Sequence, residues 1–316
     1  MFKESKVGGY VDKFLELLFF KQIKGIGNAA VNKNYLGLIK EANGIDECIK
    51  MVLECPHKID IELMMEAKNK ALIIYKAITE QVDVSVLTVF DDEYPIRLND
   101  LKNKRPPIIY AKGNIKILND KSIAVVGTRT PSVWSQKIEE KLVKRIIQLS
   151  DKVIVSGLAL GCDKIAHEST LEMKGRTVAV LPSGINVITP SAHKALATEI
   201  LDYEGCIISE YEPDEKAKMS TYVARDGLIA ALSNSTFVIE CGIKSGTMHT
   251  VDAALKMNRN VACYYTNEEG KGDFTGNKHI IDYKGAEKVT RLEELKEYLI
   301  DVDDVKENNS QISFFE

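Results

Sequence analysis

Small, hydroxylated and cationic residues follow several apolar segments of this sequence, and their types suit phosphate binding. Glycine lets a backbone N–H approach a phosphate closely, and a helix N-terminus adds unpaired N–H groups with partial positive charge. Arg129 and Lys244 add the capacity for charge-assisted hydrogen bonds to the same oxyanion. The candidate phosphate-binding residues are Gly127, Thr128, Arg129, Ser156, Gly157, Leu158, Ala159, Gly161, Asp163, His167, Gly184, Arg225, Lys244, Ser245, Gly246 and Thr247.

Each of these loops also has a purely structural explanation, because tight connections after strands favour glycine. His167 lies on a predicted helix, where we expect it to pack or to donate a hydrogen bond rather than to catalyse. Asp163 opens the same helix and is expected to cap it. Arg225 is expected either to point into the ligand crevice or to be a solvated surface arginine. The prediction of a site therefore rests on several loops together and not on any single one.

Patterns for other chemistries are missing from the sequence. The dinucleotide fingerprint Gly-x-Gly-x-x-Gly does not follow the first predicted strand of the sheet, and a P-loop pattern is also absent. The six cysteines include no Cys-x-x-Cys pair, and no Ser-His-Asp order or metal-ligand spacing is recognisable. We therefore expect no catalytic residues, no metal and no cofactor, with the cysteines as buried free thiols.

Short apolar runs alternate with helical periodicity after residue 120. The runs at 123–126, 153–155, 177–181, 206–209, 236–239 and 260–264 predict buried strands, and 135–149 and 247–257 predict helices between them. This alternation indicates an α/β, Rossmann-like parallel sheet with helices on both faces. Ligands of such sheets bind at the carboxyl ends of the strands, which is where the candidate residues fall.

The remaining segments suggest three further parts. Residues 1–80 predict a small N-terminal helical domain, in which Gly25-Ile26-Gly27 joins two helices, as in SAM or helix-hairpin-helix units. A simple helical-bundle turn that needs glycine explains this spacing equally well. Residues 81–120 carry turn chemistry and predict a connector, 121–300 the Rossmann-like domain, and 301–316 an acidic flexible tail.

Bulk charge does not indicate the ligand. The net charge of −4 equals the charge of the last sixteen residues, which contain five acids and one lysine, so residues 1–300 are neutral. A neutral protein can still present a basic groove, because phosphate affinity depends on the local field. No apolar run approaches the roughly 20 residues of a membrane span, and no signal peptide is recognisable. We expect a cytoplasmic protein without membrane contact.

Taken in order, the loops resemble the DprA/Smf family (DNA-processing protein A) over about residues 90–290. The N-terminal helices fit the helical domain of that family less specifically. The matching residues are Tyr94-Pro95, Pro107-Ile-Ile-Tyr110, Val125-Val-Gly-Thr-Arg129, Ser156-Gly-Leu-Ala159, Gly161-Cys-Asp163, Ala166-His167, Ser209-Glu-Tyr211, Arg225, Glu240, Ser245-Gly246 and Gly276-Asn277.

The resemblance implies a dimeric cytosolic protein, not known as an enzyme, that binds single-stranded DNA. It further implies delivery of that DNA to the RecA recombinase in transformation or recombination, with Arg129 as the phosphate contact. The sequence departs from the family where Arg225-Asp226-Gly227 replaces the usual Arg-Asn-Arg, and where no Pro-Gly follows Tyr264. We also expect this chain to lack the C-terminal winged-helix domain that many members carry.

Two other functions remain open from the sequence. Residues 243–250 are similar to the Pro-Gly-Gly-x-Gly-Thr-x-Glu-Glu motif of LOG phosphoribohydrolases, but His249 and Thr250 stand where the catalytic carboxylates would be. Without them the chain would be a nucleotide sensor, or a hydrolase only if Glu240 or Glu210 substituted. An interaction protein is the third class. Its partner motif would be Gln311, Ser313, Phe314 and Phe315, because 311–315 resembles the peptide that docks in the bacterial sliding clamp.

Overall fold

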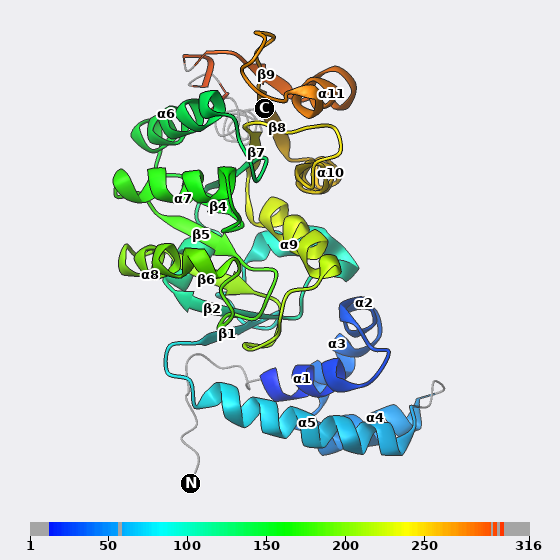
Figure 1. Ribbon diagram of the computed structural model, residues 1–316. Coiled ribbons are helices and arrows are strands. Elements are labelled where there is room, and N and C mark those ends of the chain that lie inside the picture. The colour runs from blue at the N-terminus through cyan, green and yellow to red at the C-terminus, as the bar shows by residue number, and fades with distance from the viewer. Residues whose placement is uncertain (1–12, 56–58, 292, 296–297, 300–316) are drawn as a thin grey trace, which may run out of the picture. The chain divides into compact units, whose positions relative to one another are not determined.

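The computed structural model describes residues 13–55, 59–291, 293–295 and 298–299, and it divides into two compact units, Met1–Ala111 and Lys112–Glu316 (Figure 1). The division falls inside the segment 81–120 that the sequence analysis assigns to a connector. The predicted domain boundaries themselves stay a prediction, and the predicted tail lies outside the described residues.

The first unit begins with helices, as its sequence predicts. They are α1 (Phe14–Gln22), α2 (Asn28–Ala30), α3 (Leu36–Glu41), α4 (Ile45–Glu54) and α5 (Ile61–Thr79), with a π-helical turn at Val31–Tyr35. Gly25 has a φ of 89° and Gly27 is the N-cap of α2, so the turn uses the backbone freedom of the first glycine. The helix continues from α2 through the π-helical turn into α3, so the two glycines join α1 to one longer helical stretch, and both interpretations of their spacing stay predictions.

The segment called a connector contains regular structure. Strands β1 (Ser85–Thr88) and β2 (Ile108–Gly113) pair antiparallel, and a 3₁₀ helix at Ile96–Lys104 lies between them in the chain. The Tyr94 hydroxyl donates to the Pro106 carbonyl over 2.6 Å and so closes the loop between the two strands. In the sequence, the prolines at 95, 106 and 107 indicate turns. For that reason the strands on either side of them were not predicted.

The second unit is the α/β sheet that the sequence predicts. Its strands are β3 (Ser122–Val126), β4 (Val153–Ser156), β5 (Thr177–Val180), β6 (Cys206–Ser209), β7 (Ser235–Val238), β8 (Asn260–Tyr264) and β9 (Glu287–Val289). They lie parallel in the order β6-β5-β4-β3-β7-β8-β9. Strands β4 to β6 are thus added in succession on one side of β3, and strands β7 to β9 follow on its other side. The topological switch point lies between β3 and β7.

Helices cover both faces of this sheet (Figure 1). Helices α6 (Val133–Leu149), α7 (Cys162–Glu172) and α8 (Lys194–Asp202) lie along one face, and α9 (Met219–Leu232) and α10 (Thr247–Lys256) along the other. Helix α11 (Thr275–Lys284) packs near β8. All six predicted strands and both predicted helices are present, so the predicted fold class is confirmed.

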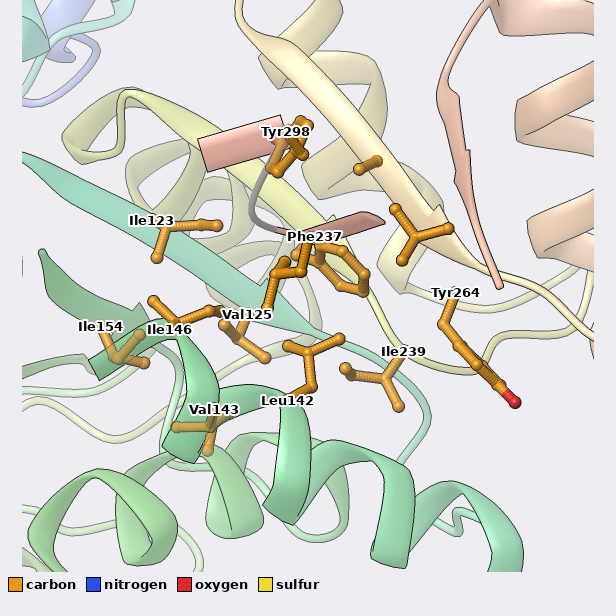
Figure 2. Packing of buried hydrophobic residues seen from close by; sticks show 14 of the residues in the cluster. Ile123, Val125, Leu142, Val143, Ile146, Ile154, Phe237, Ile239, Tyr264 and Tyr298 are labelled. Atoms are coloured by element: carbon orange, nitrogen blue, oxygen red, sulfur yellow. The ribbon is translucent and has the colours of Figure 1, made fainter. Parts of the chain in front are cut away.

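A continuous apolar core fixes α6 against the sheet. Ile123 and Val125 of β3 and Phe237 of β7 point toward α6, whose Leu142 and Ile146 face them (Figure 2). All five side chains are fully buried. Burying a side chain of this size contributes about 1.5–3 kcal/mol, so the core holds the carboxyl ends of β3 and β7 in fixed positions.

We expect Phe237→Ala to lower the free energy of unfolding by about 3–5 kcal/mol, because it removes a fully buried ring and leaves a cavity. The ring of Tyr298 packs edge-on against Phe237 at 6.2 Å and cannot fill that space from its present position. Urea denaturation of the full chain measures the change. The control Val133→Ala alters a side chain that is 68% exposed and is expected to have little effect. A loss below about 1 kcal/mol for Phe237→Ala would contradict this description of the core.

Candidate functional site

A pocket of about 590 Å³ opens at the topological switch point, beside the carboxyl ends of β3 and β7. The loop after β3, the loop before α10 and one side of α9 form its walls. Its lining residues are Val126, Gly127, Thr128, Arg129, Ala159, Asp163, Met219, Tyr222, Val223, Arg225, Asp226, Ile229, Ser245, Gly246, Thr247, His249 and Thr250. Nine of the sixteen sequence-predicted site residues are therefore brought together in one lining.

The loop after β3 is held close to α7. The Thr128 N–H donates to the Glu240 carbonyl over 2.7 Å, and the Thr128 carbonyl accepts from the Cys162 N–H over 3.1 Å. A Cβ at Gly127 would lie 2.4 Å from the Cys162 sulfur, so this close approach requires glycine. These contacts hold the loop against α7, and Arg129 lies in the lining beyond them.

Arg129 is exposed, and its guanidinium lies 5.1 Å from the centre of the Tyr222 ring. A cation at this distance over an aromatic face is stabilised electrostatically, and the side chain is thereby oriented without being neutralised. Arg129 is thus available to an anionic ligand.

Arg225 has a different environment, since it is only 3% exposed. Its Nη1 donates to the Gly157 carbonyl and, over 3.3 Å, to the Val180 carbonyl. Its guanidinium also lies 3.8 Å from the Asp163 carboxylate and 3.1 Å from the Asp226 carboxylate. Arg225 therefore lines the pocket as expected, but the alternative of a solvated surface arginine is wrong.

Two other sequence-predicted residues serve this buried arginine. A Cβ at Gly157 would lie 1.6 Å from the Nη1 of Arg225, so the arginine occupies the space that glycine leaves. Asp163 is not the N-cap of α7, because Gly161 holds that position. The Asp163 carboxylate instead accepts from the Ala159 N–H over 3.2 Å and faces Arg225. The expected capping role is thus replaced by an ion pair.

Asp226 is the second carboxylate beside Arg225. Burial raises its pKa from 3.8 to about 6, and Asp163 adds to the rise, whereas Arg225 and His249 lower it. Desolvation is the largest cause, since a buried carboxylate loses its hydration. Asp226 therefore changes charge within the pocket close to neutral pH.

Several predicted site residues have structural roles outside the lining. The Ser156 hydroxyl is fully buried and donates to the Val125 carbonyl over 2.8 Å. Leu158 is buried with a φ of 55°, and its carbonyl contacts His193 Nδ1 at 2.8 Å. Gly161 has a φ of 76°, and a Cβ there would lie 2.5 Å from the Thr128 carbonyl. These residues shape the loops around the pocket, and their geometry gives no support to direct ligand contact.

His167, Gly184 and Lys244 also lie outside the lining. His167 is fully buried with its Nδ1 2.7 Å from the Thr177 hydroxyl, and burial lowers its pKa to about 3, which agrees with the expected packing role. Gly184 packs against the backbone of Glu212 and Pro213. Lys244 is exposed on the loop after β7, next to the lining residue Ser245.

Eight lining residues were not among the predicted site residues: Val126 at the end of β3, and Met219, Tyr222, Val223, Asp226, Ile229, His249 and Thr250 on α9 and α10. Tyr222 is the one that the sequence could have indicated. It lies three residues before Arg225 on a helix, and residues at that spacing share a face. The others on α9 and α10 depend on how these two helices approach each other, which no local pattern shows.

The carboxylates proposed for hydrolysis are not placed for it. Glu240 accepts from the Ser132 N–H over 3.0 Å and from the Asp273 N–H over 3.0 Å, and the Ser132 hydroxyl lies 2.8 Å from it. Glu240 and Glu210 are both absent from the lining. Among the described residues no group of three or more His, Cys, Asp or Glu side chains is arranged for a metal ion, and no helix is long and apolar enough to cross a membrane.

Comparison with known proteins shows which family and which proteins this chain is similar to. A family model described as DNA recombination-mediator protein A matches residues 85–300. Protein Smf of Synechocystis is 32% identical over 255 residues, which cover 77% of this chain and 62% of that protein. The DNA processing protein DprA of Streptococcus pneumoniae is 30% identical over 240 residues, covering 71% of this chain and 83% of that protein. The chain thus spans less than two thirds of the Synechocystis relative.

Two solved structures are similar to this fold. The X-ray structure of DNA processing protein A from Streptococcus pneumoniae has a TM-score of 0.75 at 26% identity, covering 91% of this chain and 98% of that one. A structure described as showing the single-stranded DNA binding mode of DNA processing protein A from Helicobacter pylori has a TM-score of 0.60 at 26% identity, covering 69% and 96%.

Asp226 makes the pocket sensitive to pH. We expect the affinity for a short single-stranded oligonucleotide to rise about fivefold from pH 7.5 to pH 5, because protonation removes a negative charge beside the anion site while phosphodiesters stay ionised. Asp226→Asn should bind more tightly at pH 7.5 and show a smaller rise in affinity toward pH 5, with both proteins measured in a His249→Asn background so that the imidazole of the lining does not contribute. Fluorescence anisotropy measures both, and an identical pH profile in the variant would contradict the assignment.

Proposed function

This chain belongs to the DNA recombination-mediator protein A family, and on that premise we propose that it binds single-stranded DNA at the switch-point pocket without turnover. The main support for the proposal is that two arginines of the pocket have different environments. Arg225 is buried and paired with two carboxylates, whereas Arg129 is exposed at the mouth with its guanidinium over the Tyr222 ring. Arg129 is thus the cation that meets a phosphate.

Further features of the pocket support a phosphate ligand. Helix α10 has ten residues and begins at Thr247 in the lining, so the positive end of its dipole faces the pocket. Gly246 precedes it, and a Cβ there would meet nothing within 4 Å, which leaves the backbone accessible. Phosphate contacts of this kind are independent of base sequence, and we expect binding without strong sequence preference.

Apolar side chains at the rim suit unpaired bases. Met219 is 85% exposed and Val223 is 48% exposed, and both line the pocket beside the Tyr222 ring. Bases that are free of a duplex can stack or pack on such surfaces, and a duplex keeps them covered. The similar structure from Helicobacter pylori concerns the single-stranded DNA binding mode of that protein, which supports single-stranded DNA as the ligand.

The wider role follows from the family and is part of the proposal. A recombination mediator protects single-stranded DNA and loads the RecA recombinase, and we propose this role in the cytoplasm for a homodimer of this chain. The candidate clamp-binding motif at 311–315 lies outside the described residues. Hydrolysis of a nucleotide is disfavoured, because Asp163 and Asp226, the carboxylates of the lining, are both paired with Arg225.

Arg129→Ala should weaken binding of single-stranded oligonucleotides about tenfold or more, to a similar extent for different sequences, because it removes a charge-assisted contact to phosphate. The matched control is Arg145→Ala, since Arg145 is an exposed arginine near the far end of α6. Anisotropy titrations with single- and double-stranded oligonucleotides measure the effect. An unchanged affinity in a folded Arg129→Ala protein would remove Arg129 from the site.

A further inference from the structure

A second pocket, of about 560 Å³, lies at the same edge of the sheet but next to α6. The ends of β8 and β9 form it together with the first two turns of α6. Its lining residues are Trp134, Ile138, Tyr264, Tyr265, Thr266, Asn267, Glu268, Lys288, Thr290, Arg291 and Glu293. None of them belongs to the candidate phosphate-binding residues, and the function proposed above leaves this pocket unexplained.

Aromatic rings form the floor of the second pocket and are held in place. The Trp134 indole N–H donates to the Tyr264 hydroxyl over 3.0 Å, and the Tyr264 ring packs against Phe274 at 5.7 Å. Figure 2 shows the Tyr264 hydroxyl pointing away from the apolar cluster. Trp134 and Tyr265 stay partly exposed, so both rings are accessible.

Cations surround these rings. The Lys271 Nζ lies 3.6 Å from the centre of the Trp134 ring, and the Lys288 Nζ lies 5.1 Å from the centre of the Tyr265 ring. Arg291 is exposed at the rim. Glu268 and Glu293 also line the pocket, and Lys271 lies 3.7 Å from Glu268. In the lining Lys288 and Arg291 balance the two carboxylates, and Lys271 adds a cation against the Trp134 ring from outside the lining. Aromatic faces with cations beside them are features of surfaces that bind single-stranded nucleic acid.

The two pockets are joined by one short and rigid loop. Arg129 and Trp134 are five residues apart, so their Cα atoms lie within about 17 Å of each other. The Ser132 N–H donates to Glu240, and the Ser132 hydroxyl also contacts the Lys271 carbonyl. Ser132 thereby ties the loop that carries Arg129 to the loop that carries Lys271. A strand that left the first pocket over this loop would reach Trp134.

We propose that the second pocket is a subsite for the same DNA strand, in which a nucleobase contacts Trp134 and Tyr265 while flanking phosphates meet Lys271, Lys288 and Arg291. This inference rests on the proposed function, since the strand must first occupy the Arg129 pocket. It extends the binding surface from the α9 side of the sheet to the α6 side.

The sequence provides a direct probe of this subsite, because Trp134 is the only tryptophan in the chain. Oligothymidylates of about four and about sixteen nucleotides, which bracket the usual site sizes, are titrated into the full chain while anisotropy and tryptophan emission are recorded together. We expect both oligonucleotides to raise anisotropy, but only the longer one to quench Trp134, with both signals saturating at the same concentration.

Charge reversal tests the same subsite without altering the fold. Lys288→Glu with Arg291→Glu should weaken binding of the longer oligonucleotide about fivefold or more and leave the shorter one unaffected. The matched control is Lys256→Glu, since Lys256 is exposed in the last turn of α10, at the opposite edge of the sheet. That variant should bind both oligonucleotides as the unaltered chain does.

The outcomes separate this inference from the proposed function. Anisotropy that reports tight binding of the longer oligonucleotide, with unchanged Trp134 emission and no effect of the double variant, overturns the subsite and leaves the proposed function standing. No anisotropy change with either oligonucleotide removes both. Full quenching by thymidine monophosphate alone, at the concentration at which the longer oligonucleotide acts, also overturns the subsite, because the pocket would then bind nucleotides independently of a strand.

Discussion

The buried guanidinium of Arg225 is the interaction on which the pocket depends. It connects the end of β4 through the Gly157 carbonyl, the end of β5 through the Val180 carbonyl, and α7 through Asp163. The buried Asp163 and the partly buried Asp226 face it, so removing the arginine would leave both carboxylates uncompensated, and breaking a buried ion pair typically costs about 3–5 kcal/mol. The close packing of Gly157 against Nη1 leaves no room for a side chain at that position. The arginine therefore fixes the wall of the pocket rather than its ligand.

Because Arg225 is buried and paired with carboxylates, the positive charge available to a ligand comes from Arg129 on the loop after β3. Tyr222 lies beside both arginines, with its ring centre 5.1 Å from the Arg129 guanidinium and 5.8 Å from that of Arg225, and so connects the buried cation to the exposed one.

Asp226 and Gly227, which stand where the family usually has Asn and Arg, affect the pocket in different ways. Asp226 adds a carboxylate whose pKa of about 6 places its titration near neutrality. At Gly227 a Cβ would meet nothing within 4 Å, so the structure does not exclude a longer side chain where the family has arginine.

Much of the fold was predictable, because parallel strands buried on both faces appear as short apolar runs. Strand β9 was missed, since Glu287 and Lys288 are exposed and only Val289 is buried. The loop carrying Arg129 was also predictable from its residue types after a strand. The burial of Arg225 was not, because its partners at Gly157 and Asp163 are more than sixty residues away in the sequence and meet it only in the folded sheet. His167 illustrates the opposite case, in which the expected packing role agrees with the structure.

The central claim is that Arg129 holds a backbone phosphate of single-stranded DNA, and the salt dependence of binding tests it most directly. For a single strand the plot of log K against log salt concentration has a slope of about −0.7 for each phosphate contact. We expect the slope for Arg129→Ala to be less steep than that of the unaltered protein by about 0.7, with no change for Arg145→Ala. Identical slopes for Arg129→Ala and the unaltered protein would contradict the claim.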